Sequence, residues 1–145
     1  MGTSPGKNDS GFSTDEKAAM KQAAYERKSR PKKTPQEDLE DCLAAIEGMS
    51  EPDKSLATRV HRLVTDANPD LQPRTWYGMP AYSLGGNTIC FLQVGSKFKT
   101  RYATLGFSDK AKLDAGGFWP NAYALTELTA DIEGEITELV KRATR

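Results

Sequence analysis

The sequence predicts an α+β fold: an antiparallel β-sheet of about five strands with helices packed on one face, plus an N-terminal helical extension. Apolar residues recur at helical spacing in two stretches before residue 70 and in one after residue 129. Between them, residues 73–107 form short β-prone segments separated by glycine-containing turns, as in an antiparallel meander. A chain of 145 residues has the length of one domain with an extension.

The first 33 residues differ in charge from the rest of the chain. They hold eight Lys and Arg and four Asp and Glu, a net charge of +4, whereas the remainder holds 12 and 16, a net charge of −4. Residues 1–12 are polar and glycine-rich, which predicts a disordered tail. Ser13–Glu16 has the pattern of a capping box, so we expect a basic helix and linker over residues 13–33. The α+β domain is then expected to span residues 34–145.

Two helices open the predicted domain. Thr34 is the N-cap of the first, Pro35 takes its first position, and Glu37 reaches back to complete a capping box. Its apolar stripe consists of Leu39, Cys42, Leu43, Ile46 and Met49. The second helix starts at Ser50–Asp53 and ends at Asn68–Asp70. Its apolar stripe consists of Leu56, Val60, Leu63, Val64 and Ala67.

Tight turns join the predicted strands. The strands span residues 74–77, 81–84, 88–94, 98–106 and 123–128, and the alternative for the last is an extended segment that packs there. We expect turns or a bulge at Gly78–Pro80, Gly85–Asn87 and Gly95–Ser96, because glycine adopts positive φ at low cost and proline cannot donate to a ladder. A short helix is predicted over Ser108–Leu113. A final helix follows the cap residue Thr129, and its stripe consists of Ile132, Ile136, Leu139, Val140 and Ala143.

The sequence lacks the usual signatures of catalysis. It contains no phosphate-binding loop, dinucleotide-binding motif or nucleophile elbow, and its one histidine, His61, leaves little for a His-based triad. We therefore expect a binding or carrier protein rather than an enzyme. Cys42 and Cys90 occupy apolar positions without metal-ligand spacing, so both are expected to be reduced core residues. Because no apolar signal segment or membrane span is visible, a cytoplasmic location is expected.

One candidate binding site is a group of basic and aromatic residues in the β-region. The group consists of Arg74, Trp76, Tyr77, Tyr82, Lys97, Lys99, Arg101 and Tyr102. Arginine combined with aromatic rings can hold an anionic or planar ligand. The alternative is that Trp76, Tyr82 and Phe91 belong to the core while the cations form a solvated sheet edge. The candidate ligand-binding residues that then remain are Arg74, Tyr77, Lys99 and Arg101.

A second candidate site is the acidic face of the first helix. It consists of Glu37, Asp38, Glu40 and Asp41, and residues 37 and 41 are one turn apart. Carboxylates grouped in this way attract hard cations such as iron or calcium weakly, with water completing the coordination shell. The alternative is a solvated helix face whose acidic first turn is favoured by the helix dipole.

The segment Trp76–Tyr82 reads Trp-Tyr-Gly-Met-Pro-Ala-Tyr, and it follows two helices that end in Ala-Asn-Pro-Asp at residues 67–70. With the glycine turn, the apolar strand and Phe98–Arg101, this pattern resembles the YdhG-like domains, a bacterial family of mostly unknown function. The resemblance covers about residues 34–143. It implies a frataxin-like α+β arrangement, and some family members are described as intracellular iron chaperones. The resemblance implies that iron would be bound weakly by Glu37, Asp38, Glu40 and Asp41.

Three hypotheses of function follow. In the first, the protein is an iron chaperone that binds iron weakly on the acidic helix face. In the second, a small molecule or a protein partner binds at Arg74, Tyr77, Lys99 and Arg101. In the third, the basic arm contacts nucleic acid, which the zero net charge of the chain disfavours. We expect a monomer or a weak dimer that does not associate with membranes.

Overall fold

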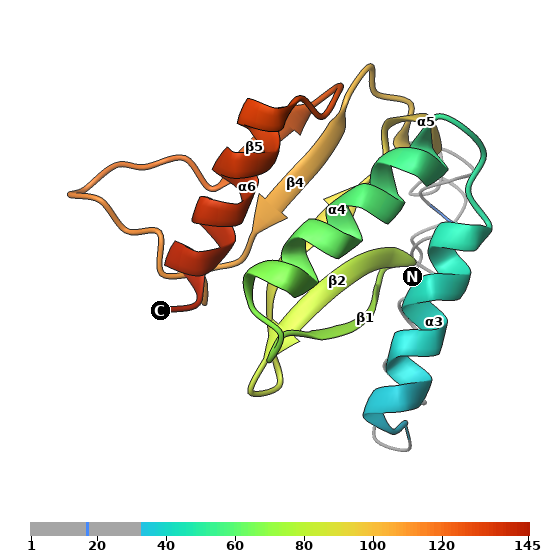
Figure 1. Cartoon of the computed structure of the whole chain (residues 1–145), viewed down its shortest axis with the longest axis horizontal. Coiled ribbons are helices and arrows are strands. Elements are labelled where there is room, and N and C mark those ends of the chain that lie inside the picture. The colour runs from blue at the N-terminus through green and yellow to red at the C-terminus, as the bar shows by residue number, and fades with distance from the viewer. Residues whose placement is uncertain (1–16, 18–32) are drawn as a thin grey trace, which may run out of the picture.

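The computed structural model of the chain describes residue 17 and residues 33–145, except for the side chains of residues 97 and 98. The predicted tail and nearly all of the predicted basic helix and linker lie outside the described residues. The described elements are α3 (Pro35–Glu47), α4 (Asp53–Ala67), β1 (Gln72–Trp76), β2 (Met79–Leu84), β3 (Asn87–Gln93), α5 (Gly95–Phe98), β4 (Ala103–Phe107), β5 (Ala122–Leu125) and α6 (Ala130–Ala143) (Figure 1). This order confirms the predicted α+β fold.

The five strands form one antiparallel sheet in the order β1-β2-β3-β4-β5, so each strand pairs with its neighbours in sequence. Helix α3 packs along β1, while α4 and α6 lie side by side over the same face of the sheet (Figure 1). The register places Tyr82 of β2 beside Cys90 of β3, and Cys90 beside Phe107 of β4. Alternate side chains of each strand therefore point toward the helices.

The helices begin at the residues that the sequence predicts. The Thr34 Oγ1 accepts a hydrogen bond from the Glu37 amide at 3.1 Å, and the Glu37 carboxylate accepts one from the Thr34 amide at 2.8 Å. This reciprocal pair is the predicted capping box. Thr129 caps α6 through one hydrogen bond, which its Oγ1 accepts from the Ile132 amide at 3.3 Å. Within the described part of the chain, no helix has the length and apolar character needed to cross a membrane.

The turn between β1 and β2 lies one residue earlier than predicted. Tyr77 and Gly78 both have positive φ, 54° and 77°, so these two residues make the turn. Met79 pairs with Trp76, and Pro80 pairs with Thr75 inside the sheet. Pro80 is tolerated there because the ladder between β2 and β3 begins only at the following residue. The predicted hairpin turn at Gly85–Gly86 is confirmed, since both glycines have positive φ.

The prediction of one strand over residues 98–106 is wrong in its first half. Residues 95–98 form the single helical turn α5, and β4 starts only at Ala103. Lys99 adopts a left-handed conformation with φ of 61°, and the Thr100 amide donates to the Gly95 carbonyl at 2.9 Å. This backbone hydrogen bond closes the loop around Gly95. The alternation of residue types over 98–102 is typical of a strand, but the segment forms this compact loop instead.

The predicted helix over Ser108–Leu113 is also absent from the structure. The Ser108 Oγ accepts a hydrogen bond from the Lys110 amide at 3.1 Å, which favours a local turn over a helix. The Lys112 amide donates instead to the Ala143 carbonyl at the end of α6, at 2.9 Å. The predicted strand over residues 123–128 is confirmed as β5 but ends at Leu125.

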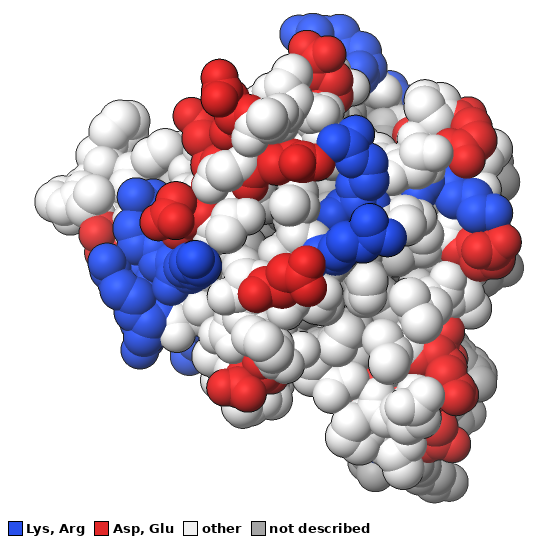
Figure 2. Space-filling model, in the orientation of Figure 1, with Lys and Arg blue, Asp and Glu red and all other residues white. Residues whose placement is uncertain are grey.

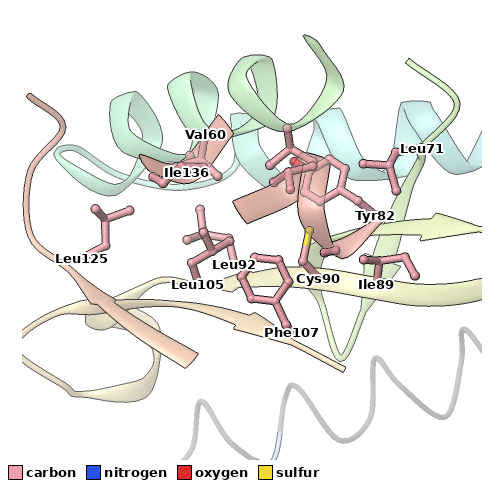
Figure 3. Packing of buried hydrophobic residues seen from close by; sticks show 14 of the residues in the cluster. Val60, Leu71, Tyr82, Ile89, Cys90, Leu92, Leu105, Phe107, Leu125 and Ile136 are labelled. Atoms are coloured by element: carbon pink, nitrogen blue, oxygen red, sulfur yellow. The ribbon is translucent and has the colours of Figure 1, made fainter. Parts of the chain in front are cut away.

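The core lies between the sheet and the helices (Figure 3). Tyr82 is its largest fully buried side chain, and it packs with Cys42 from α3, Val60 from α4 and Cys90 from β3. Both cysteines are free and have no exposed surface, as predicted. Ile136 of α6 closes the other end of the core against Leu105 and Leu125 (Figure 3). The sheet is thereby fixed against three helices from both halves of the sequence.

Candidate functional site

Several connections meet at one end of the sheet. Ala81 of β2 pairs with Phe91 of β3, so the turn after β1 lies at the same end as the connection from β3 to β4. The linker from β5 to α6 also leaves the sheet there, because Leu125 pairs with Ala103 at the start of β4. The first turn of α4 lies against this end as well.

A groove of about 510 Å³ opens at this end of the sheet. This volume lies within the range of small-molecule binding sites. Three parts of the chain form the groove: the start of α4, the connection between α5 and β4, and the linker between β5 and α6. Its lining residues are Pro52, Asp53, Ser55, Leu56, Arg59, Gly95, Ser96, Thr100, Arg101, Tyr102, Ala103, Leu125, Thr126, Glu127 and Leu128.

Arg101 and Tyr102 combine a cation with an aromatic ring in the groove. The Arg101 guanidinium carbon lies 5.3 Å from the centre of the Tyr102 ring, which is a cation–π distance. Arg101 is exposed, whereas Tyr102 is half-buried. The packed ring therefore holds the guanidinium near the groove while its N–H groups stay accessible to a ligand.

Two other charged residues of the groove, Arg59 and Asp53, join its walls. The Arg59 guanidinium forms an ion pair with Glu133 of α6 and donates to the Leu128 carbonyl at 3.2 Å. Asp53 accepts a hydrogen bond from the Ser96 hydroxyl, which joins α4 to α5. Both contacts link segments that are far apart in the sequence, so the groove is a property of the folded chain.

Gly95 sets the shape of the groove on the α5 side. A Cβ atom at this position would lie 2.8 Å from both the Thr100 and the Tyr102 carbonyl oxygens. Only glycine allows so close an approach of backbone to backbone. The Thr100 hydroxyl donates to the Tyr102 carbonyl at 2.8 Å and stabilises the same loop. Gly95 therefore determines where Arg101 and Tyr102 lie.

The four predicted ligand-binding residues do not all line this groove. Arg101 lines the groove, and Lys99 lies in the same connection but not among the lining residues. Tyr77 is in the turn between β1 and β2, and its ring contacts Trp76 edge-to-face at 4.9 Å between centroids. Arg74 is on β1 beside Ala81. Of the four, the groove contains Arg101 alone.

The aromatic residues assigned to the core divide between the two faces of the sheet. Tyr82 is fully buried under the helices, as predicted. Trp76 and Phe91 are half-buried, and their rings meet edge-to-face at 5.0 Å between centroids. The register places Phe91 beside Gly106, where any Cβ atom would lie within 2.3 Å of the Phe91 ring. This second aromatic cluster includes Tyr77 and packs on the face opposite the helices.

The acidic face of α3 is held by contacts within the chain. Glu37 completes the capping box, Glu40 accepts from the Gln36 side chain at 3.2 Å, and Asp41 forms an ion pair with Lys33. Asp38 also has an interaction partner. Among the residues that the structure describes, no group of three or more His, Cys, Asp and Glu side chains is arranged to hold a metal ion.

A second set of titratable groups is buried around Tyr82. The Tyr82 hydroxyl lies 2.9 Å from the His61 Nδ1 and is also hydrogen-bonded to the Cys42 thiol. Burial raises the pKa of both Cys42 and Cys90 to about 12, and it lowers the pKa of His61. The thiols thus stay protonated and unreactive, which gives this cluster a structural role.

Comparison with known proteins gives no further assignment: no family model matches the chain, and no curated protein or solved structure is significantly similar to it. The groove is therefore assigned as the candidate site from its geometry alone. Arg101 and Tyr102 are the lining residues that the sequence points to. The other lining residues, such as Arg59 and Thr126, could not be found from the sequence because the lining comes from three distant segments. No local motif marks them. The pairing of β4 with β5 and the contacts of Arg59 and Asp53 of α4 bring these segments together.

Proposed function

We propose that the protein is a binding or carrier domain that holds a small carboxylate-containing molecule in the groove between α4, the α5–β4 connection and the β5–α6 linker. The observation that carries the proposal is the placement of Arg101 and Tyr102 in a groove of about 510 Å³. A guanidinium donates two parallel hydrogen bonds to a carboxylate, and the neighbouring ring offers a surface for a planar group.

The remaining charges of the groove support a ligand of this kind. Asp53 and Arg59 are already bound to Ser96 and Glu133. Arg101 is therefore the groove cation best placed to bind an added anion. Glu127 also lines the groove and is exposed. A ligand that carries a hydrogen-bond donor as well as a carboxylate, such as an amino acid, can use both residues.

Replacing Arg101 tests this proposal. We expect Arg101→Gln to weaken binding of benzoate or phenylalanine by about ten- to hundredfold, because a hydrogen bond to a charged group contributes roughly 1.5–3 kcal/mol. The affinities are measured by following amide chemical shifts during titration. Arg62→Gln is the matched control, since Arg62 is an exposed cation of α4 outside the groove. Equal affinities for both variants would contradict a role for Arg101.

Iron binding on α3 is the competing proposal, and the resemblance to YdhG-like domains supports it. If it holds, titration with Fe(II) broadens the amide signals of residues 37–41, and Glu37→Gln combined with Asp41→Asn removes the broadening. The existing contacts of these carboxylates favour the opposite result, since a metal ion must compete with Lys33 and with the capping box. Unchanged spectra at about millimolar Fe(II) would end the iron hypothesis.

The proposed location is the cytoplasm. Cys42 and Cys90 are free and buried, which suits a compartment where thiols stay reduced.

A further inference from the structure

We propose that a second copy of this chain docks on the open edge of β5, so that the two sheets become continuous and the two α6 helices pack side by side across the seam. Within residues 33–145, no segment pairs with the outer edge of β5, which is the last strand of the sheet. Unpaired edges of this kind accept a further strand unless charge, proline or a covering element prevents it.

The backbone of β5 is oriented for such pairing. The Phe107 amide donates to the Asn121 carbonyl at 2.9 Å, and the ladder continues from this pair through Leu105–Tyr123 to Ala103–Leu125. In an antiparallel ladder, residue pairs that exchange hydrogen bonds alternate with pairs that do not. Ala122 and Ala124 belong to the pairs that do not, so their amides and carbonyls point away from β4. Their methyl side chains leave the edge accessible, and both residues are exposed.

A twofold axis through Tyr123 would let the outward amides and carbonyls of Ala122 and Ala124 form hydrogen bonds with a second copy. Ala122 then pairs with Ala124 of the second copy, and Ala124 with its Ala122. Each of these two pairs exchanges both of its N–H···O bonds. The arrangement is self-complementary, as a twofold interface requires.

The position of α6 leaves room for its counterpart. Its apolar side lines a small pocket together with Leu105 of β4 and with Tyr123 and Leu125 of β5, and the same residues belong to or pack against one core cluster, so the helix lies over both strands (Figure 1). Neighbouring strands are about 4.8 Å apart, so this is the distance between the two copies of β5. If each α6 axis lies about half a strand spacing from its own β5, toward β4, the two helix axes are about 10 Å apart. Helices in contact are separated by 8–10 Å, so the two copies of α6 would touch without overlap.

The outer side of α6 has the pattern of a helix contact. Beside the edge of β5, a hollow of about 670 Å³ is lined by Tyr123 and by a single helical stripe, which consists of Asp131, Gly134, Glu135, Glu138, Leu139 and Arg142. Gly134 has nothing within 4 Å of its Cβ direction, so none of the residues that the structure describes requires a glycine in this helix. A glycine inside a helix costs about 1 kcal/mol relative to alanine, and close approach of a second helix accounts for it.

Charges along α6 identify a second copy as the partner. The first turn of α6 is acidic and its last turn is basic. Figure 2 shows the same separation on this face, with acidic residues toward the start of α6 and basic residues toward its end. Antiparallel packing brings Asp131 to Arg142 of the second copy, and Gly134 to its Leu139. Glu135 and Glu138 meet near the axis and repel, so the dimer is weak.

Sedimentation of the full chain over a range of concentrations tests the proposal. We expect a reversible dimer that Asp131→Arg and Arg142→Asp each weaken by about tenfold, while the double variant regains the original association. Gly134→Lys should also prevent association. Ala44→Lys, on the exposed side of α3, is the matched control and should leave it unchanged.

Thermal unfolding of the same variants separates docking from folding. Gly134→Lys should keep or raise the Tm of the monomer, because lysine favours a helix more than glycine does. Three results would overturn the proposal: a monomer at protein concentrations of about 1 mM, a dimer that persists in Gly134→Lys, or a charge-swapped double variant that does not reassociate.

Discussion

Tyr82→Ala is expected to lower the free energy of unfolding by about 3–5 kcal/mol, because it leaves a cavity at the centre of the core. Domains of this size are stable by roughly 5–15 kcal/mol, so a large part of the stability is lost. Tyr82 has no exposed surface and is the largest of the fully buried side chains. The measurement is urea-induced unfolding followed by circular dichroism.

Tyr82→Phe separates the ring of Tyr82 from its hydroxyl, and Tyr102→Phe is the matched control. Tyr82→Phe removes the hydrogen bonds to His61 and Cys42 and should cost about 1–3 kcal/mol. Tyr102→Phe removes a hydroxyl from a half-buried ring at the groove and should change the stability by less than about 0.5 kcal/mol. A loss below about 1 kcal/mol for Tyr82→Ala would show that Tyr82 is not at the centre of the core.

Gly95→Ala is expected to abolish binding in the groove and to destabilise the chain by about 1–3 kcal/mol. The added methyl group would lie 2.8 Å from two carbonyl oxygens, so the segment from Thr100 to Tyr102 must move. Arg101 moves with this segment, and the ligand loses its main contact. Binding of benzoate and the midpoint of urea unfolding are measured on the same sample.

Gly117→Ala is the control for this substitution. Gly117 has open space around its Cβ direction and no positive φ, so the same methyl group should leave both stability and binding unchanged. If Gly95→Ala binds benzoate as the original chain does, the shape of the α5–β4 connection does not determine the site.

The helices and the order of the strands could be predicted from local patterns. A capping box marks the start of α3 and the Thr129 cap marks the start of α6. Apolar stripes mark the buried faces of α3, α4 and α6. These signals are local because they act within one or two turns. The hairpin at Gly85–Gly86 was equally clear, since two consecutive glycines allow positive φ at both positions of the turn.

The connection between β3 and β4 could not be predicted because its conformation depends on distant contacts. The alternation of residues 98–106 is typical of a strand, but backbone hydrogen bonds to Gly95 and the contact of Ser96 with Asp53 of α4 determine the loop. The missing helix at Ser108–Leu113 has a similar cause, since the Lys112 amide bonds to the end of α6.

The candidate site was predicted only in part for the same physical reason. Arg101 belongs to the predicted group of basic and aromatic residues, because arginine combined with aromatic rings in the β-region indicates a site for an anionic or planar ligand. Arg59, Ser96 and Thr126 come from a helix, a loop and a linker, and only the folded sheet brings them to one groove. Arg74 and Tyr77 belong to the same predicted group, but they lie on and beside β1, which is the edge strand opposite β5.

Amide chemical-shift mapping of the unmodified chain with benzoate tests the groove most directly. We expect saturable shifts confined to residues 52–59, 95–103 and 125–128, the three segments that line it. Saturable binding that instead shifts the amides of residues 37–41, or no shift at about 10 mM benzoate, which corresponds to a Kd weaker than millimolar, would contradict the assignment of the site.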